Sequence, residues 1–174
     1  MAIAWALFII RVFAGLTLAA HGAQKLFGWF GGPGYARLEQ GFRARGFRPA
    51  WLWVALAILG EVGGGLALAL GFLTPLGAAG AVGAMAMAAS THWKNGFFGN
   101  RGGFEYPFAL LAMSAAIGIA GPGTYSLDHL FGIALPTLLF VVLALAALVT
   151  DGIGIAMTRP APGTASSPQQ SHAA

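Results

Sequence analysis

Cysteine is absent from the 174-residue sequence. Its absence excludes disulfide bonds, thiolate nucleophiles, iron–sulfur clusters and cysteine-based zinc sites. Any redox function of this chain must therefore use a bound cofactor or a partner protein.

Charged residues are scarce. They make up 8% of the chain, whereas hydrophobic residues make up 57%, and a soluble domain usually carries about 25% charged residues. The mean hydropathy is +0.76. So few charges cannot cover a surface that faces water, and the sequence predicts an integral membrane protein.

Three common catalytic motifs are missing as well. The sequence contains no Walker A motif, no GxSxG motif and no HExxH motif, so nothing in it favours a P-loop nucleotidase, a serine hydrolase or a zinc peptidase. The net charge is +4, but the basic residues lie between apolar runs, which is typical of contact with anionic lipid headgroups. We therefore expect the lipid bilayer as the main partner, and no nucleic acid.

Five apolar segments approach the roughly 20 residues that a helix needs to cross the hydrocarbon core. They are Ile3–Phe27, Ala50–Leu70, Leu76–Trp93, Phe104–Ala120 and Ala134–Thr150, separated by turn-forming stretches such as GWFGGPGY at 28–35. Arg11 interrupts the first segment and no basic region precedes it, so we expect a permanent helix rather than a signal peptide. The predicted fold is an all-α membrane protein, a compact bundle of about five transmembrane helices. It occupies residues 1–157, and a disordered cytoplasmic tail follows at 158–174.

The basic residues outside the first segment's interior all fall on one side of this five-span topology. They are Lys25, Arg37, Arg43, Arg45, Arg48, Lys94, Arg101 and Arg159. Because basic loops stay in the cytoplasm, we expect a multi-pass protein of the plasma membrane with its N-terminus outside and its C-terminus inside.

Polar residues within and beside the segments occur in five short strings. They are HGAQKLFGWFGGPG at 21–34, GEVGGG at 60–65, HWKNGFF at 92–98, GGFEYPFALL at 102–111 and GPGTYSLDHL at 121–130. In this order and spacing they resemble the DoxX family of small bacterial membrane proteins, over about Ala4 to Leu130. The resemblance implies a helical bundle, commonly of four spans. It also implies redox processes such as those of terminal quinol oxidase and thiosulfate:quinone oxidoreductase subunits, or of oxidative-stress complexes. The apolar segment after Gly132 predicts one extra C-terminal span beyond a four-helix DoxX-like core.

Arg11 and Glu61 are ionisable residues inside predicted spans, where charge is costly. Counted from the outer ends of the first and second segments, both lie roughly 14 Å deep. Adjacent antiparallel helices would allow them to form a buried ion pair that fixes the helix register. Glu61 is equally a candidate proton or substrate site, because a buried carboxylate is readily neutralised.

A second polar group is expected near the cytoplasmic face, where the ends of three segments lie at one depth. Its candidate binding residues are His21, Gln24, Lys25, Trp29, His92, Trp93, Asn95, Glu105 and Tyr106. Histidines, a carboxylate and aromatic walls suit a quinone headgroup, which needs hydrogen-bond donors and a group that exchanges protons. The candidate catalytic residues are Glu61, His21, His92 and Glu105.

Other interpretations of these residues remain open. The aromatic residues are also typical of an interfacial belt, and the lysines of snorkelling to headgroups. His21, His92 and Glu105 are also acceptable metal ligands, but no local HxxxH spacing supports a metal site, so quinone is favoured and no metal is expected. In the loop before the last segment, Ser126 is expected to cap a short helix containing Asp128 and His129.

The sequence thus favours a quinone- or quinol-linked oxidoreductase component that acts with a soluble or membrane redox partner. One alternative is a non-enzymatic scaffold that recruits soluble redox enzymes through the basic loop Arg37–Arg48. A second is a small transporter, which the buried Arg11 and Glu61 suggest.

Overall fold

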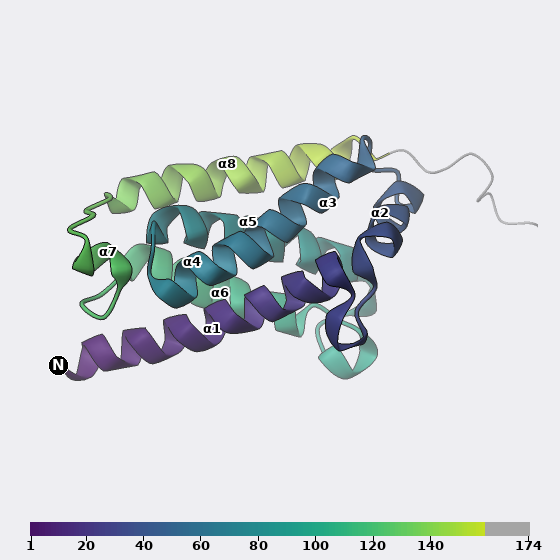
Figure 1. Ribbon diagram of the computed structural model, residues 1–174. Coiled ribbons are helices and arrows are strands. Elements are labelled where there is room, and N and C mark those ends of the chain that lie inside the picture. The colour runs from purple at the N-terminus through teal and green to yellow at the C-terminus, as the bar shows by residue number, and fades with distance from the viewer. Residues whose placement is uncertain (159–174) are drawn as a thin grey trace, which may run out of the picture.

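The computed structural model of the chain describes residues 1–158, and every predicted apolar segment is helical in it (Figure 1). The second segment is one rod built from two α-helices joined by a π-helical turn. The long elements are α1 (Ala2–Phe27), α3 (Ala50–Ile58), the π turn η2 (Leu59–Gly63), α4 (Gly64–Leu70), α5 (Thr74–His92), α6 (Glu105–Ala120) and α8 (Thr137–Ala156). The predicted all-α membrane fold is confirmed, whereas the predicted tail lies almost wholly outside the described residues.

Short helices occupy the connections. They are η1 (Trp29–Gly31), α2 (Gly34–Ala44), η3 (Trp93–Asn95), η4 (Gly99–Arg101) and α7 (Leu127–Leu130). The segment treated as a basic loop therefore contains an 11-residue helix, α2. The chain leaves α1 at Gly28, whose φ of 75° is a left-handed conformation that suits glycine. In Figure 1, α2 lies at one end of the bundle, while the N-terminus and α7 lie at the other.

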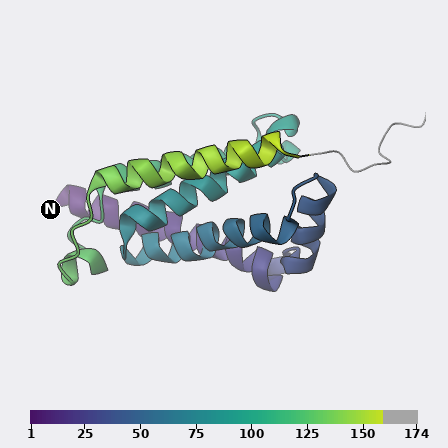
Figure 2. The ribbon, with the colours of Figure 1, turned by 90° about the horizontal axis from the view of Figure 1, so that it is seen from above.

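Helix α5 is the centre of the bundle. It contacts α4, η2, α6 and α8, while α1 packs on the other side of α4 and on α6. Seen from above, α8 runs along one side of α5 and the α3–α4 rod along the other (Figure 2). Most of α5 is small residues that are buried on contact with these neighbours, including Ala78, Ala81 and Gly83.

Close helix contacts depend on glycine. A Cβ added to Gly15 would lie 2.5 Å from the Gly65 carbonyl oxygen, and one added to Gly60 would lie 2.5 Å from the Gly80 carbonyl oxygen. The first contact joins α1 to α4, and the second joins the π turn to α5. Small residues at helix interfaces are expected in lipid, because dispersion contacts between backbones replace the hydrophobic effect as the driving force.

The outer surface of the bundle is apolar. Large side chains such as Phe13 at 70%, Leu59 at 67% and Leu138 at 69% exposure face outward, and a continuous apolar surface of this kind belongs in lipid. Within the described residues, three rods are each long and apolar enough to cross a membrane, namely α1, α3–α4 and α8. Helix α6 is a shorter apolar helix, and α5 is shielded by the other helices.

Candidate functional site

Arg11 and Glu61 do not pair, so the predicted ion pair is wrong. Gly15 of α1 packs level with Gly65 and Ala69, and Gly22 packs level with Glu61 and Val62. Glu61 therefore lies about 16 Å further along α1 than Arg11, at 1.5 Å per residue. The depth estimate failed because it assumed that the two rods begin at the same level, whereas α1 extends well beyond the end of α4 (Figure 1).

Arg11 instead holds a loop in place. Its guanidinium donates to the carbonyl oxygen of Pro122 at 2.7 Å and to that of Tyr125, and its side chain fills the space beside Gly71. The residue is 1% exposed. A guanidinium carries five donors in a fixed fork, which suits two backbone acceptors at once. This arrangement ties α1 to the 121–126 loop, which explains the burial of Arg11 without any catalytic role.

The partner of Glu61 is Lys25. The lysine Nζ forms a salt bridge with Glu61 Oε1, while Glu61 Oε2 is buried with no hydrogen-bond partner in residues 1–158. The Glu61 side chain is 1% exposed and that of Lys25 24%. A carboxylate this deep costs a great deal of free energy unless a cation compensates its charge. One oxygen of Glu61 is thus left available for a further donor.

The π-helical turn η2 presents Glu61 to α1. Such turns add one residue to an α-helix and are frequent at functional sites. Glu61 and Gly60 are both buried in this turn. On the side of α1, Gly22 leaves the space that Glu61 and Val62 occupy, because a Cβ at Gly22 would lie 2.4 Å from a Val62 methyl carbon.

His21 and Tyr106 extend this site toward α6. Their ring centroids are 4.6 Å apart with a tilted geometry. His21 is one helical turn before Lys25, so both side chains lie on the same face of α1. We call Lys25, Glu61, His21 and Tyr106 the polar cluster: three elements, α1, η2 and α6, bring together an amine, a carboxylate, an imidazole and a phenol.

The remaining candidate side chains near this end of α5 form contacts with the 93–104 loop. His92 Nδ1 and Asn95 Nδ2 each lie 3.0 Å from the Gly102 carbonyl oxygen, and Glu105 accepts a 2.8 Å hydrogen bond from the Gly99 backbone amide. Trp93 stacks on Phe104 with centroids 4.7 Å apart. These contacts order the loop. Among residues 1–158, no group of three or more histidine and acidic side chains is placed to hold a metal ion.

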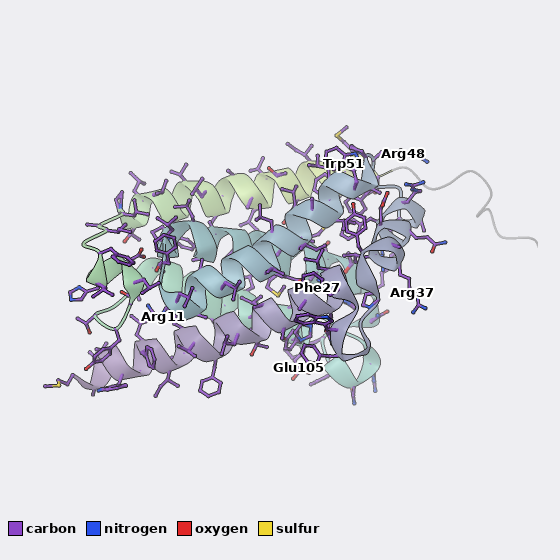
Figure 3. All side chains as sticks on the ribbon, in the orientation of Figure 1. Arg11, Phe27, Arg37, Arg48, Trp51 and Glu105 are labelled. Atoms are coloured by element: carbon purple, nitrogen blue, oxygen red, sulfur yellow. The ribbon has the colours of Figure 1, made fainter. Side chains whose placement is uncertain are left out.

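Gln24 and Trp29 flank the polar cluster at the end of α1. Gln24 lies against Gly32, where a Cβ would come within 2.5 Å of it. Trp29 stacks on Phe27 with centroids 4.9 Å apart and is 57% exposed. Phe27 and Glu105 both lie at the end of the bundle that carries Arg37 and Arg48 (Figure 3).

Two further acidic residues occupy positions that were not predicted as sites. Asp128 is buried and accepts hydrogen bonds from the backbone amides of Leu73 and Thr74 and from the Thr74 hydroxyl, at 2.7 to 2.9 Å. It therefore caps α5, while Ser126 caps α7 by accepting from the His129 amide, as predicted. Asp151 lies inside the last apolar helix, where an acid within an otherwise apolar run was a signal available in the sequence.

The family comparison agrees with this architecture. The DoxX family model matches residues 6–93, which is just over half of the chain. The chain belongs to the DoxX family. The matched part of this DoxX protein runs through α1 to α5 and includes Arg11, His21, Lys25 and Glu61, whereas Tyr106 and the whole of α8 lie beyond it. Neither the curated proteins nor the solved structures gave a match.

Proposed function

We propose that this DoxX protein is a quinone- or quinol-linked component of a membrane oxidoreductase. The observation that carries the proposal is the polar cluster, in which the Lys25–Glu61 salt bridge lies on a π turn next to the His21–Tyr106 ring contact. Reduction of a quinone to a quinol consumes two electrons and two protons. The chain has no cysteine or other intrinsic redox group, so a soluble or membrane redox partner supplies or accepts the electrons.

Each member of the polar cluster has a suitable part in that chemistry. Lys25 and Tyr106 offer N–H and O–H donors to the quinone carbonyl oxygens, and Glu61 and His21 are the side chains that can accept and release protons. The free Oε2 of Glu61 supports this assignment, because it leaves one carboxylate oxygen able to accept a hydrogen bond from a bound molecule. The 93–104 loop, with Asn95 and the flanking His92 and Glu105, is proposed as an outer part of the same site, since it leads into α6, which carries Tyr106.

Quinone binding tests the proposal. Decylubiquinone is expected to raise the melting temperature of the protein in nanodiscs, and His21→Ala and Tyr106→Phe are expected to abolish that rise. His129→Ala is the matched control, because this exposed histidine lies in α7 at the other end of the bundle. The His92→Ala variant tests whether the 93–104 loop takes part in quinone binding. Absence of any quinone effect on the wild-type protein in lipid would refute the proposal.

A second function is favoured by the surface of α2. Arg37, Arg43, Arg45 and Arg48 are exposed around this helix. Phe42 of α2 packs on Phe47 with centroids 5.1 Å apart, and Phe47 packs on Trp53 of α3 with centroids 5.3 Å apart, which fixes α2 to the bundle. A rigid cationic surface suits an acidic protein partner, so we also propose that the protein recruits a soluble redox enzyme. Substituting the four arginines with glutamine is expected to remove that partner from cross-linked membranes without altering quinone binding.

The transporter alternative rests on the burial of Arg11 and Glu61. These two residues lie at different levels of the bundle and have different partners, so they do not form one charged site. The location we propose is a bacterial plasma membrane, with the end that carries α2 in the cytoplasm.

A further inference from the structure

A cavity of about 460 Å³ opens between the α3–α4 rod, α5 and α8. Figure 2 looks toward α5 between the two flanking rods. Gly77, Gly80 and Gly83 of α5 line the cavity, and the close packing of Gly77 on Ala67 and of Gly83 on Ala147 brings the flanking helices against α5. We call this cavity the lateral groove.

The lateral groove is long and apolar. Its lining residues on the α3–α4 rod run from Trp53 to Ala67, which corresponds to about 21 Å of helix. Nearly all of its other side chains are aliphatic, aromatic or absent, and the exceptions are Thr150 and Asp151 of α8. In a bilayer, an opening of this shape between helices is filled by a hydrocarbon chain rather than by water.

Asp151 is the unusual residue of the groove. Its Oδ2 is buried and has no hydrogen-bond partner within residues 1–158, and it lies 4.0 Å from the position that a Cβ of Gly83 would take. Thr150 differs, because its hydroxyl already donates to the Ala146 carbonyl oxygen at 2.8 Å. A buried carboxyl without a donor is costly, so Asp151 points to a donor carried by the occupant of the groove.

The position of Asp151 limits the chemistry of that donor. It is five residues before Ala156, the last residue of α8, and therefore about 7 Å inside the helix end. A phospholipid ammonium at this depth would bring its phosphate into apolar surroundings beside a carboxyl group, at a high cost in desolvation and repulsion. A neutral hydroxyl also donates a hydrogen bond and carries no such cost.

Trp53 closes the groove at this end. Its ring packs against Gly154 of α8, where a Cβ would lie 2.0 Å from the indole. A chain that enters between α3–α4 and α8 therefore ends beneath Trp53, next to Asp151. The closed end of the groove and the unpaired carboxyl group of Asp151 therefore lie at the same place. This arrangement suits the end of a bound hydrocarbon chain.

We propose that the lateral groove binds a single hydrocarbon chain that ends in a hydroxyl group, and that this hydroxyl donates to Asp151. The site is separate from the polar cluster, because Leu59, Gly60 and Gly63 of the π turn line the groove whereas Glu61 is paired with Lys25 of α1. It also depends on α8, which lies outside the matched family region.

Native mass spectrometry of the detergent-solubilised full chain tests this proposal, because one spectrum reports bound molecules and oligomeric state together. The probes are 1-hexadecanol and its methyl ether, which has the same chain but no O–H donor. We expect the alcohol to bind about tenfold more tightly than the ether, the effect of one hydrogen bond to a carboxylate.

Two variants make the test specific to Asp151. Asp151→Leu is expected to bind alcohol and ether equally, and its retained binding of the ether shows that the groove is still folded. Thr150→Val, the matched control, is expected to keep the tenfold preference. The proposal is overturned if the wild-type protein does not distinguish the two probes, if Asp151→Leu keeps the preference, or if the groove is covered in a dimer that binds neither probe.

Discussion

The two cations of α1, Arg11 and Lys25, are compensated in different ways. Within residues 1–158, Arg11 forms no salt bridge and instead donates to two loop carbonyl oxygens, whereas Lys25 pairs with Glu61. The geometry suits the chemistry of each group, since a guanidinium forks between acceptors and an ammonium acts as a point charge. Loop structure and salt bridge are therefore separable by mutation.

Loss of Lys25 should destabilise the protein more than loss of the whole pair. Lys25→Met leaves the buried Glu61 carboxylate uncompensated, and we expect the free energy of unfolding to fall by about 3 kcal/mol. In Lys25→Met/Glu61→Gln the buried charge is gone, so the loss should be smaller than the sum of the two single losses. Denaturation in detergent measures all three. Additive losses would show that the pair is not coupled.

Arg11→Lys should also be destabilising although the charge is retained. A single ammonium cannot reproduce the fork to Pro122 and Tyr125, so we expect a loss of about 1–2 kcal/mol. Arg43→Lys is the control, because Arg43 pairs with Glu39 in an exposed i,i+4 salt bridge that should contribute at most about 0.5 kcal/mol. Equal melting temperatures for the two variants would contradict the role given to Arg11.

At the scale of elements, the glycines of α1, η2 and α4 set the distances between helices. Gly60 and Gly64 form a GxxxG step, which is typical of close helix packing, and both residues lie against carbonyl oxygens of α5, those of Gly80 and Gly77. The π turn was not predicted, because GEVGGG is compatible with a regular helix. The wider turn places Gly60 against α5 and Glu61 against α1, and these contacts are not visible in the local sequence.

Gly15→Leu should separate α1 from α4. The added side chain would collide with the backbone of Gly65 and Ala69, and backbone cannot move aside as a flexible side chain does. We expect the melting temperature in detergent to fall by about 10 °C or more. Gly152→Leu is the matched control, since no atom lies within 4 Å of a Cβ at that helical glycine. A stable Gly15→Leu protein would show that this contact is dispensable.

Helix positions were largely predictable and site geometry was not, although α8 runs to Ala156 rather than to the predicted Thr150. The predicted second segment, Ala50–Leu70, coincides with the α3–α4 rod, because long apolar runs and Gly-Pro breaks act locally along the chain. The association of Lys25 with Glu61 depends on how far α1 slides along α4, and that register is set by Gly15 and Gly22. No property of the sequence near Glu61 reveals it. His92 and Glu105 likewise form hydrogen bonds with backbone groups of the adjoining loop. The residue types alone did not indicate these contacts.

At the scale of the whole molecule, charge is distributed unevenly between the two ends. Arg37 and Arg48 lie at one end, and Arg11, at the other, is buried (Figure 3). Reporters fused after Thr158 and inserted at Gly123 test the proposed orientation. We expect the fusion after Thr158 to read cytoplasmic and the insertion at Gly123 to read external. The opposite result would reverse the orientation and place the polar cluster on the external side.

The central position of α5 has a consequence for biogenesis. This 19-residue helix is rich in glycine and alanine and is not among the described helices that are apolar enough to span a membrane by themselves. A translocon that partitions each nascent helix by its own hydrophobicity would insert α5 into lipid with low efficiency. Because α6 and α8 are synthesised after it, stable insertion of α5 has to wait for them, and a ribosome stalled before α8 emerges should leave it exposed to membrane proteases.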